Sequence, residues 1–404
     1  MAFCQGIWLF GFLSIIDILV MLLYFALFAV PVVAYFATVG RGGRSAAFLG
    51  MFLGALALIL GCADMLGGYD RYIYGAVFDE TAEMMYKGYP WYGGSLYALY
   101  PKEIGYDMLN VLIGQFTMNR YVFIFTVTLI IYALLFVSLR RYATNYPMAL
   151  VLFMGLWFFF TFTYLRQVLA ASIAWLAVDY AVRRRPWAFF GIVLLAFTFH
   201  NSAIVFAPFY FLPQRKMDKN SVIALMVACG VVGLIGTTDA LFSQFGSLSG
   251  SEARTETYTT EAEGGGFRFD YLLEAVVMLG YILLRYDRID GKSAKEVTLL
   301  NMALVFCAIL LVFTKSLNGG RLSWFYMLGL ICTLTSLASR ERVVTTYSAS
   351  LVVMMALLFA RIVISWGSML YPYKTFFTDG FRPGDKIHDV YEYDGKYDID
   401  KFYK

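Results

Sequence analysis

Charge is scarce in this 404-residue chain, because only 15% of its residues are Asp, Glu, Lys or Arg, against roughly a quarter in a soluble domain. Hydrophobic residues make up 60% of the chain, and its mean hydropathy is +0.67. Apolar runs of about 20 residues, the length that a helix needs to cross a bilayer, recur along the sequence. The composition therefore predicts an all-α integral membrane protein.

Other absences narrow the class of protein further. The five cysteines are scattered, with neither the spacing of a metal site nor that of a disulfide framework. We find no long internal repeat, no soluble enzyme domain and no Gly-rich phosphate loop. The first ten residues lack the basic region of a signal peptide, so we take them as part of the mature protein. A net charge of +4 is too modest to indicate nucleic-acid binding.

Run length and helix breakers predict about twelve transmembrane or half-membrane helices. They lie near 17–39, 46–65, 121–139, 147–163, 165–182, 187–199, 202–213, 221–242, 270–284, 297–314, 321–338 and 344–365. The segments 187–199 and 202–213 are each too short to span a bilayer. They form either one long helix broken at His200 or two half-helices that meet inside the protein.

The distribution of positive charge decides between these two arrangements. Loops 40–45, 140–146, 183–186, 214–220, 285–296 and 339–343 hold half of the 32 Lys and Arg residues. Cytoplasmic loops are enriched in these residues, so we assign all six loops to the inner side. This topology requires 187–213 to enter and leave on the same side, as a hairpin of half-helices. Its turn at His200 is then expected to line a cavity, since backbone outside a helix needs polar partners at membrane depth.

The outward-facing segments differ in kind. We predict a single transmembrane helical domain over 1–365, with outer loops at 66–120 and 243–269, followed by a polar extracytoplasmic tail over 366–404. The loop 243–269 is rich in Gly, Ser and Thr, which is typical of a mobile loop or lid. Aromatic residues reach 18% of the chain and suit both interfacial belts and surfaces that stack on sugars.

Ionisable residues near the membrane are costly, so each is a candidate for function. Arg166 opens a predicted span at its outer end, where a guanidinium can bind a diphosphate in a bidentate manner. The alternative is an interfacial arginine that reaches the lipid headgroups. His200 lies at the predicted half-helix turn and can serve as a general base or as a phosphate donor. The alternative is a histidine that only caps the broken helix.

Further candidates lie in the outer segments. Lys315 and Arg321 flank a turn with two glycines that can approach a phosphate closely, although a plain interfacial turn has the same pattern. Asp70, Arg71 and Glu103 belong to the first outer loop, where carboxylates can orient or deprotonate sugar hydroxyls. A surface Asp-Arg pair without further role is the alternative. Sugar-stacking candidates on this loop are Tyr69, Tyr72, Trp91, Tyr92 and Tyr106.

The order of these motifs resembles a known family. GYDRY in the first outer loop is followed by EIGYDMLN, then by YLRQVLAASIAW, and then by a segment ending in AFTFHNSAIVFAPFYFL. From about Asp70 to Pro213, this series resembles the EpsG family, which belongs with the Wzy-type polysaccharide polymerases. The later part of the chain is similar mainly in hydropathy and in the arginine at 321.

The resemblance implies an enzyme of the bacterial inner membrane, with a GT-C-like fold and an active site on the outer face. Its substrates would be oligosaccharide repeat units on undecaprenyl diphosphate, and a chain-length regulator is a possible partner. Arg166 and Arg321 would stabilise the leaving diphosphate. The base would be His200 first, and Glu103 or Asp70 second, although His200 could bind the diphosphate instead. We expect Asp70, Arg71, Glu103, Tyr106 and Lys315 to contact substrate, and no cofactor or metal.

Three other functions remain open. An O-antigen-type ligase would keep the same arginines and histidine and differ only in its acceptor. A transporter or flippase of lipid-linked oligosaccharides would show paired repeats and charges near the bilayer midplane, whereas the candidates here cluster at one face. A structural subunit without activity would leave the outer arginines and the histidine at a broken segment unexplained.

Overall fold

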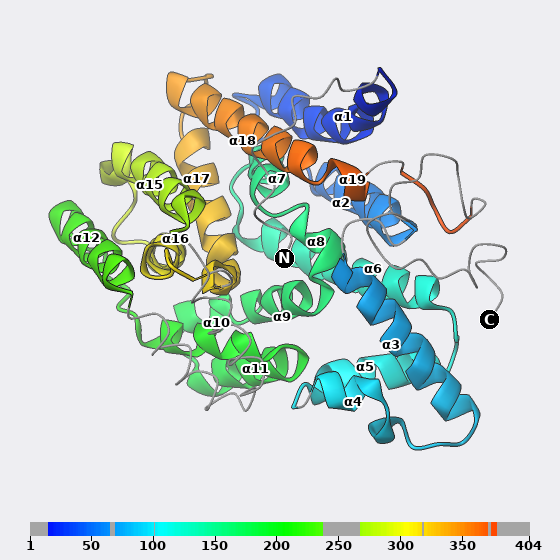
Figure 1. Ribbon diagram of the computed structural model, residues 1–404. Helices are drawn as coiled ribbons and strands as arrows, with labels where there is room; N and C mark the ends of the chain where they lie inside the picture. Colours follow the sequence, from blue (N-terminus) through cyan, green and yellow to red (C-terminus); the bar gives the residue numbers. More distant parts are fainter. Residues whose placement is uncertain are drawn as a thin grey trace.

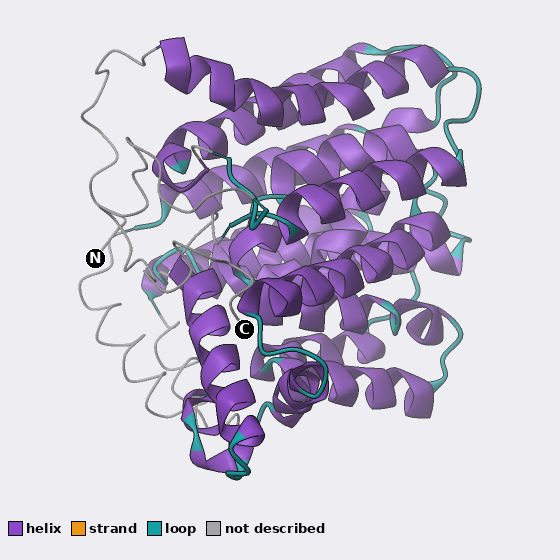
Figure 2. Cartoon of the chain, turned by 90° about the vertical axis from the view of Figure 1, so that its right-hand side faces the viewer, coloured by secondary structure: helices purple, strands orange, loops and turns teal. Residues whose placement is uncertain are grey.

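The computed structural model describes residues 15–64, 69–100, 102–236, 267–316, 319–370 and 373–377. These residues form helices and no β-strand, with one isolated bridge between Ala63 and Thr375. Most helices run side by side in roughly one direction (Figure 2). The prediction of an all-α protein is confirmed, whereas the GT-C-like arrangement and the number of transmembrane helices stay predictions.

The helices in the first half of the chain are α1 (Ile15–Thr38), α2 (Ala46–Gly61), α3 (Tyr69–Tyr86), η1 (Trp91–Gly93), α4 (Ser95–Leu99), α5 (Ile104–Gly114), α6 (Arg120–Tyr142), α7 (Tyr146–Leu156), α8 (Phe160–Thr163), α9 (Leu165–Trp175), α10 (Val178–Val182), α11 (Pro186–Phe199) and η2 (Asn201–Phe211). The second half contains α12 (Lys219–Ile235), α15 (Phe269–Leu284), η3 (Tyr286–Arg288), α16 (Ala294–Val312), η4 (Gly319–Tyr326), α17 (Met327–Ser339), α18 (Thr346–Ser365) and α19 (Gly367–Leu370). Figure 1 shows their arrangement, with α9 near the centre and α18 beside α1.

Among the described residues, six helical segments are long and apolar enough to cross a membrane: Met21–Thr38, Arg120–Tyr142, Leu165–Val182, Ala294–Val312, Gly319–Ser339 and Thr346–Ser365. Several shorter apolar helices accompany them. Many of the exposed side chains on these helices are large and apolar, such as Val33 and Leu357. An apolar outer surface of this kind suits lipid rather than water. The protein is therefore a multi-pass membrane protein.

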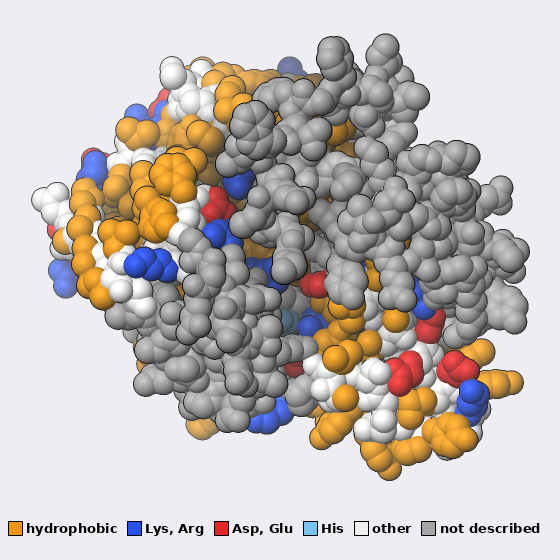
Figure 3. Space-filling model, viewed as in Figure 1, with side chains coloured by type: hydrophobic (Ala, Val, Ile, Leu, Met, Phe, Trp, Pro, Cys, Tyr) orange, Lys and Arg blue, Asp and Glu red, His pale blue; other side chains and the backbone are white. Residues whose placement is uncertain are grey.

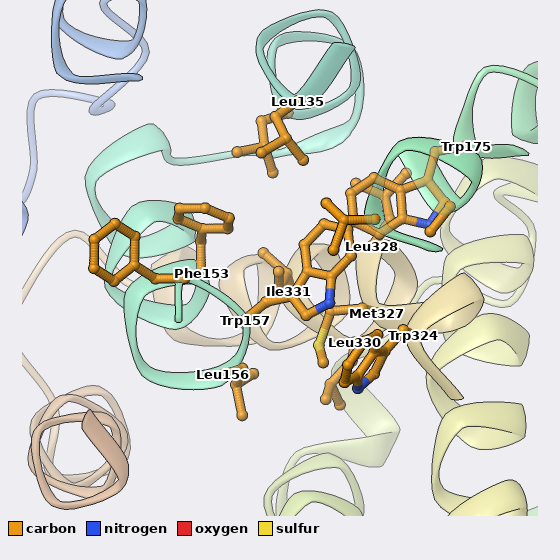
Figure 4. Packing of buried hydrophobic residues seen from close by; sticks show 14 of the residues in the cluster. Leu135, Phe153, Leu156, Trp157, Trp175, Trp324, Met327, Leu328, Leu330 and Ile331 are labelled. Carbon is orange, nitrogen blue, oxygen red and sulfur yellow. The ribbon is translucent and has the colours of Figure 1, made fainter. Parts of the chain in front are cut away.

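The centre of the bundle consists of helices that are buried on all sides. Every residue of α7 and of α9 is buried; α7 packs against α17, and α9 packs against α6 and η4. The rings of Trp157 and Trp175 lie 4.7 Å apart between these helices, surrounded by leucine and methionine side chains (Figure 4). Trp175 donates its indole N–H to the carbonyl of Phe325 over 2.9 Å. This contact ties α9 to η4, the element that carries Arg321.

Local sequence signals explain where several helices begin. Asn119 caps α6 by accepting from the N–H groups of Tyr121 and Val122, and Asn145 caps α7 by accepting from Met148. Asp218 caps α12 in the same way. A polar side chain at this position satisfies N–H groups that have no partner inside the helix. Such caps fix helix ends where the chain leaves an apolar run.

The expected hairpin at 187–213 is present. Helix α11 ends at His200, whose backbone is extended at φ −158°, and η2 begins at the next residue. The rings of Phe189 and Tyr210 lie 5.2 Å apart, so the beginning of α11 packs against the end of η2. The two segments thus run back along each other, and His200 lies at their turn.

The six basic loops lie at one end of the bundle and contact one another. Arg184 donates to the carbonyl of Leu212, Lys216 to that of Ile289 over 2.9 Å, and Lys295 to that of Arg141 over 2.7 Å. Tyr146 and Gly43 are joined by a backbone hydrogen bond of 2.8 Å, which connects the first two loops. Arg183 also forms an ion pair with Asp179, four residues earlier in the chain, over 2.8 Å. The positive charge therefore gathers on one side, as the topology requires.

The segment 66–120 contains helices that the sequence interpretation missed. In this region α3 and α5 pack against each other and against α6, with η1 and α4 between them in the chain. The first part of the predicted tail also packs into the bundle, since Lys374 is buried 3.8 Å from Asp64. The predicted lid is described only from residue 267 onward, and the tail beyond 377 lies outside the described residues.

Candidate active site

Glu103 and Arg166 form a buried ion pair at the end of the bundle opposite the basic loops. Glu103 immediately precedes α5 and is 1% exposed, and Arg166 in the first turn of α9 is 7% exposed. Arg166 donates from Nη1 to Oε2 of Glu103. A cation is unfavourable at the positive end of a helix dipole unless an anion accompanies it. Glu103 supplies one anionic partner there.

Three tyrosines surround the Arg166 guanidinium. Its Cζ lies 3.7 Å from the ring centroid of Tyr100, 5.4 Å from that of Tyr74 and 5.7 Å from that of Tyr106. The electron-rich ring faces attract the cation and keep it from water. Arg166 Nε is nevertheless buried without a hydrogen-bond partner in the described part of the chain. The guanidinium is therefore held in place, while its Nε–H donates to no described group.

A glycine lets α5 approach the end of α11. A Cβ atom at Gly105 would lie 2.3 Å from Oγ1 of Thr198, closer than atoms can approach, so a larger residue here would push the helices apart. The close approach brings the carboxylate of Glu103 to the hairpin turn. There Oε1 of Glu103 accepts from the backbone N–H of Asn201 over 3.3 Å. The predicted motifs at 103, 166 and 200 thus meet in one place.

His200 is oriented by the residue two positions further on. Its Nδ1 accepts from the N–H of Ser202 over 3.2 Å and lies 2.7 Å from Ser202 Oγ. A backbone N–H can only donate, so Nδ1 carries no proton. In the neutral ring the proton is therefore assigned to Nε2. This arrangement makes His200 a hydrogen-bond donor through Nε2 and disfavours its role as a base through Nδ1.

Arg321 reaches the same end of α9 from η4. Its Nη2 donates to Oη of Tyr164 over 2.9 Å, and its Cζ lies 4.2 Å from the centre of that ring. Its carbonyl accepts from Nε2 of Gln167 over 3.1 Å. Tyr164 and Gln167 bracket Arg166 in the sequence. Both predicted phosphate-binding arginines therefore lie around the beginning of α9.

The other predicted residues differ in their surroundings. Arg71 is completely buried and donates to the carbonyls of Leu60, Ala63 and Phe162, the first over 2.6 Å. These three hydrogen bonds all go to backbone groups. Asp70 lies in the first turn of α3. Lys315 is exposed beside Gly236 at the end of α12, and none of the contacts described for it joins it to Arg321. Tyr106 is buried against Tyr74 and Tyr100.

The sequence interpretation missed Asp107 and Asn201. Asp107 follows Glu103 by one helical turn and is 1% exposed, whereas Ile104, Met108 and Leu112 on the opposite side of α5 are exposed. A helix that buries its polar side and exposes its apolar side suits contact with lipid outside and a polar site inside. The spacing of Glu103, Asp107 and Asn110 was the available signal.

The described residues contain no group of three or more His, Cys, Asp or Glu side chains placed to hold a metal ion. Independence from metal stays a prediction. On the face shown in Figure 3, acidic and basic side chains lie next to each other between areas of hydrophobic side chains. The polar groups of the candidate site are arginines, carboxylates, a histidine and phenol rings, which suits anionic and polyhydroxylated ligands.

The fold defines a polytopic α-helical membrane protein with a buried polar site at one end of its bundle. The chain matches the EpsG family over residues 47–375, which is most of its length, and it belongs to that family. This confirms the resemblance to the Wzy-type polymerases and suggests a membrane polysaccharide polymerase. Neither the curated proteins nor the solved structures gave a significant match.

Proposed function

We propose that this protein is a glycan polymerase that works at the extracytoplasmic face of a bacterial cytoplasmic membrane. It transfers a growing polysaccharide from undecaprenyl diphosphate onto the end of a new lipid-linked repeat unit. The observation that carries the proposal is the meeting of Arg166, Arg321 and His200 around the beginning of α9. This end of α9 is opposite the basic loops, which the positive-inside rule places in the cytoplasm.

The chemistry follows from the leaving group. When the bond between the anomeric carbon and the diphosphate breaks, negative charge develops on the diphosphate oxygens. Arg166 has an unpartnered Nε, and both arginines carry forked donors that match phosphate geometry. His200 adds an N–H donor from Nε2. Because these groups are positioned before the substrate arrives, they stabilise the developing charge without reorganisation.

The ion pair with Glu103 gives this arrangement its rigidity. Glu103 engages Arg166 through one oxygen and the hairpin turn through the other. The three elements α5, α9 and η2 are thereby fixed relative to one another. A guanidinium that is preoriented in this way loses less side-chain entropy when the diphosphate binds. Exposed aromatic rings of the outer helices, including Tyr92 and Tyr97, offer faces for sugar stacking.

The proposal is tested with the purified full chain in lipid vesicles and a lipid-diphosphate-linked repeat unit. Wild type should form a ladder of longer glycans. His200→Ala and Arg321→Ala should lower its rate by about 100-fold or more, as the loss of one charge-stabilising donor does. Asp79→Asn is a control, because Asp79 belongs to a second buried ion pair, which it forms with Arg120. An active Arg321→Ala variant would contradict the assigned role.

A further inference from the structure

We propose that Asp107 is the general base that accepts the proton of the attacking sugar hydroxyl. The inference rests on the proposed polymerase function and names one further catalytic residue for it. Glu103, which immediately precedes α5, and Asp107 in the first turn of α5 lie one helical turn apart and have different surroundings. Glu103 is held by the ion pair, whereas Oδ1 of Asp107 is buried without a hydrogen-bond partner among the described residues.

The hydrogen bonds of Glu103 leave it poorly suited to this role. Its Oε2 accepts from Arg166 and its Oε1 from the N–H of Asn201. Hydrogen bonds and a positive charge both stabilise the ionised carboxylate, which makes it a weak base. His200 accepts hydrogen bonds at Nδ1 and keeps its proton on Nε2. Glu103 and His200, two of the three residues predicted as bases, are therefore engaged in other ways.

Asp107 has the opposite properties. Its side chain is 1% exposed, yet its Oδ1 has no hydrogen-bond partner among the described residues. The same holds for Oδ1 of Asn201, which is 8% exposed. A buried acceptor without a donor costs free energy, so two of them beside one ion pair call for an explanation. A sugar supplies the missing groups, because its hydroxyls are hydrogen-bond donors.

The charges around Asp107 suit a base. Burial, and next the negative charge of Glu103, raise the pKa of Asp107 to about 7, and Arg166 acts in the opposite direction. The elements packed against α5 add Tyr74 on α3, the Asp79–Arg120 pair between α3 and α6, and His200 at the end of α11. A base works best when its pKa lies near the working pH.

The acceptor hydroxyl gives its proton to Oδ1 of Asp107 while its oxygen forms a bond with the anomeric carbon of the donor. The bond from that carbon to the diphosphate oxygen breaks, and its electron pair leaves on the lipid diphosphate. Arg166, Arg321 and His200 stabilise that charge. Asp107 then releases the proton to water, and no oxidant, reductant or further reactant is needed.

The test compares wild type, Asp107→Asn and Asp107→Glu in the same vesicles between about pH 5 and pH 9. The wild-type rate should rise with pH through about 7, as Asp107 loses its proton. Asp107→Asn should lower kcat by roughly 100-fold to 10,000-fold with little change in KM, and abolish this rise. Asp107→Glu should recover part of the rate. Glu83→Gln is the control, because Glu83 is an exposed carboxylate paired with Lys87.

A stability measurement separates catalysis from misfolding. Because the folded pKa of Asp107 lies above its unfolded value, the folded protein binds more protons, and this residue makes folding less favourable as pH rises through about 7. Asp107→Asn removes that effect, so its melting temperature above neutral pH should equal or exceed that of wild type. An Asp107→Asn enzyme with the wild-type rate and pH profile would overturn the base role alone. A wild type that forms no linkage would overturn the polymerase and the base role together.

Discussion

Arg166 donates a hydrogen bond to Glu103 across 63 positions of sequence, and both residues are buried. Buried ion pairs contribute little net stability when both partners are present, but removing one partner leaves an uncompensated charge. Variants of this pair can therefore distinguish an effect on stability from an effect on activity.

Glu103→Gln should destabilise the protein by about 3–5 kcal/mol, because Arg166 stays buried and charged without its carboxylate. Thermal unfolding in detergent measures this change. Adding Arg166→Gln to the Glu103→Gln protein should restore much of the stability. The double variant should nevertheless form no polymer ladder, because it lacks the Arg166 guanidinium. Asp79→Asn, in the second buried pair, should also destabilise but keep its activity per folded molecule. A fully active double variant would contradict the role of Arg166.

Replacing His200 tests whether it donates or accepts a proton. His200→Gln places an amide N–H donor near the position of Nε2 but provides no base. If His200 donates to the diphosphate, this variant should keep a measurable rate, whereas His200→Ala should lose about 100-fold or more. Initial rates with the lipid-linked unit distinguish them. Equal and complete loss in both variants would favour a base.

Arg71 gives a prediction about folding. Its guanidinium donates to three backbone carbonyls, so Arg71→Met should remove these hydrogen bonds, at a cost of about 1–3 kcal/mol for each buried carbonyl that is left without a donor. We expect a lower melting temperature with an unchanged KM in the fraction that remains folded. A normal melting temperature with a raised KM would instead establish Arg71 as a substrate-binding residue, as the sequence predicted.

The assignment of the two membrane sides is tested by thiol labelling in a cysteine-free background. Tyr92 and Lys292 are both exposed, Tyr92 on the outer helices and Lys292 in one of the basic loops. A membrane-impermeant maleimide should label Tyr92→Cys in intact cells and Lys292→Cys only after the membrane is opened. The reverse pattern would place the candidate site in the cytoplasm.

The apolar runs were sufficient to predict the helical framework, because a bilayer demands a nearly continuous run of apolar residues. Charge in the loops predicted the hairpin at His200, since positive charge reports topology. The helix α3 was missed because it mixes polar with apolar residues, and α5 was missed because it is short. The pairing of Glu103 with Arg166 could not be predicted either, because it depends on how α5 approaches α11 at Gly105.

The same limit explains why Asp107 and Asn201 escaped notice. In the sequence, Asp107 lies four residues after Glu103 and Asn201 directly follows His200, and only Glu103 and His200 were predicted as site residues. The importance of Asp107 and Asn201 comes from buried oxygens without partners, a property of three-dimensional packing. Arg71 is the opposite case. Its charge and its place in an outer segment predicted a substrate-binding residue, whereas in the structure it donates to three backbone carbonyls.

The most direct test counts two products in one reaction. Purified protein in vesicles receives a lipid-linked repeat unit, and we measure new glycosidic linkages together with released lipid diphosphate. The account predicts a glycan ladder and one lipid diphosphate for each linkage formed. Movement of intact lipid-linked units across the bilayer without a new linkage would contradict it and show a transporter instead.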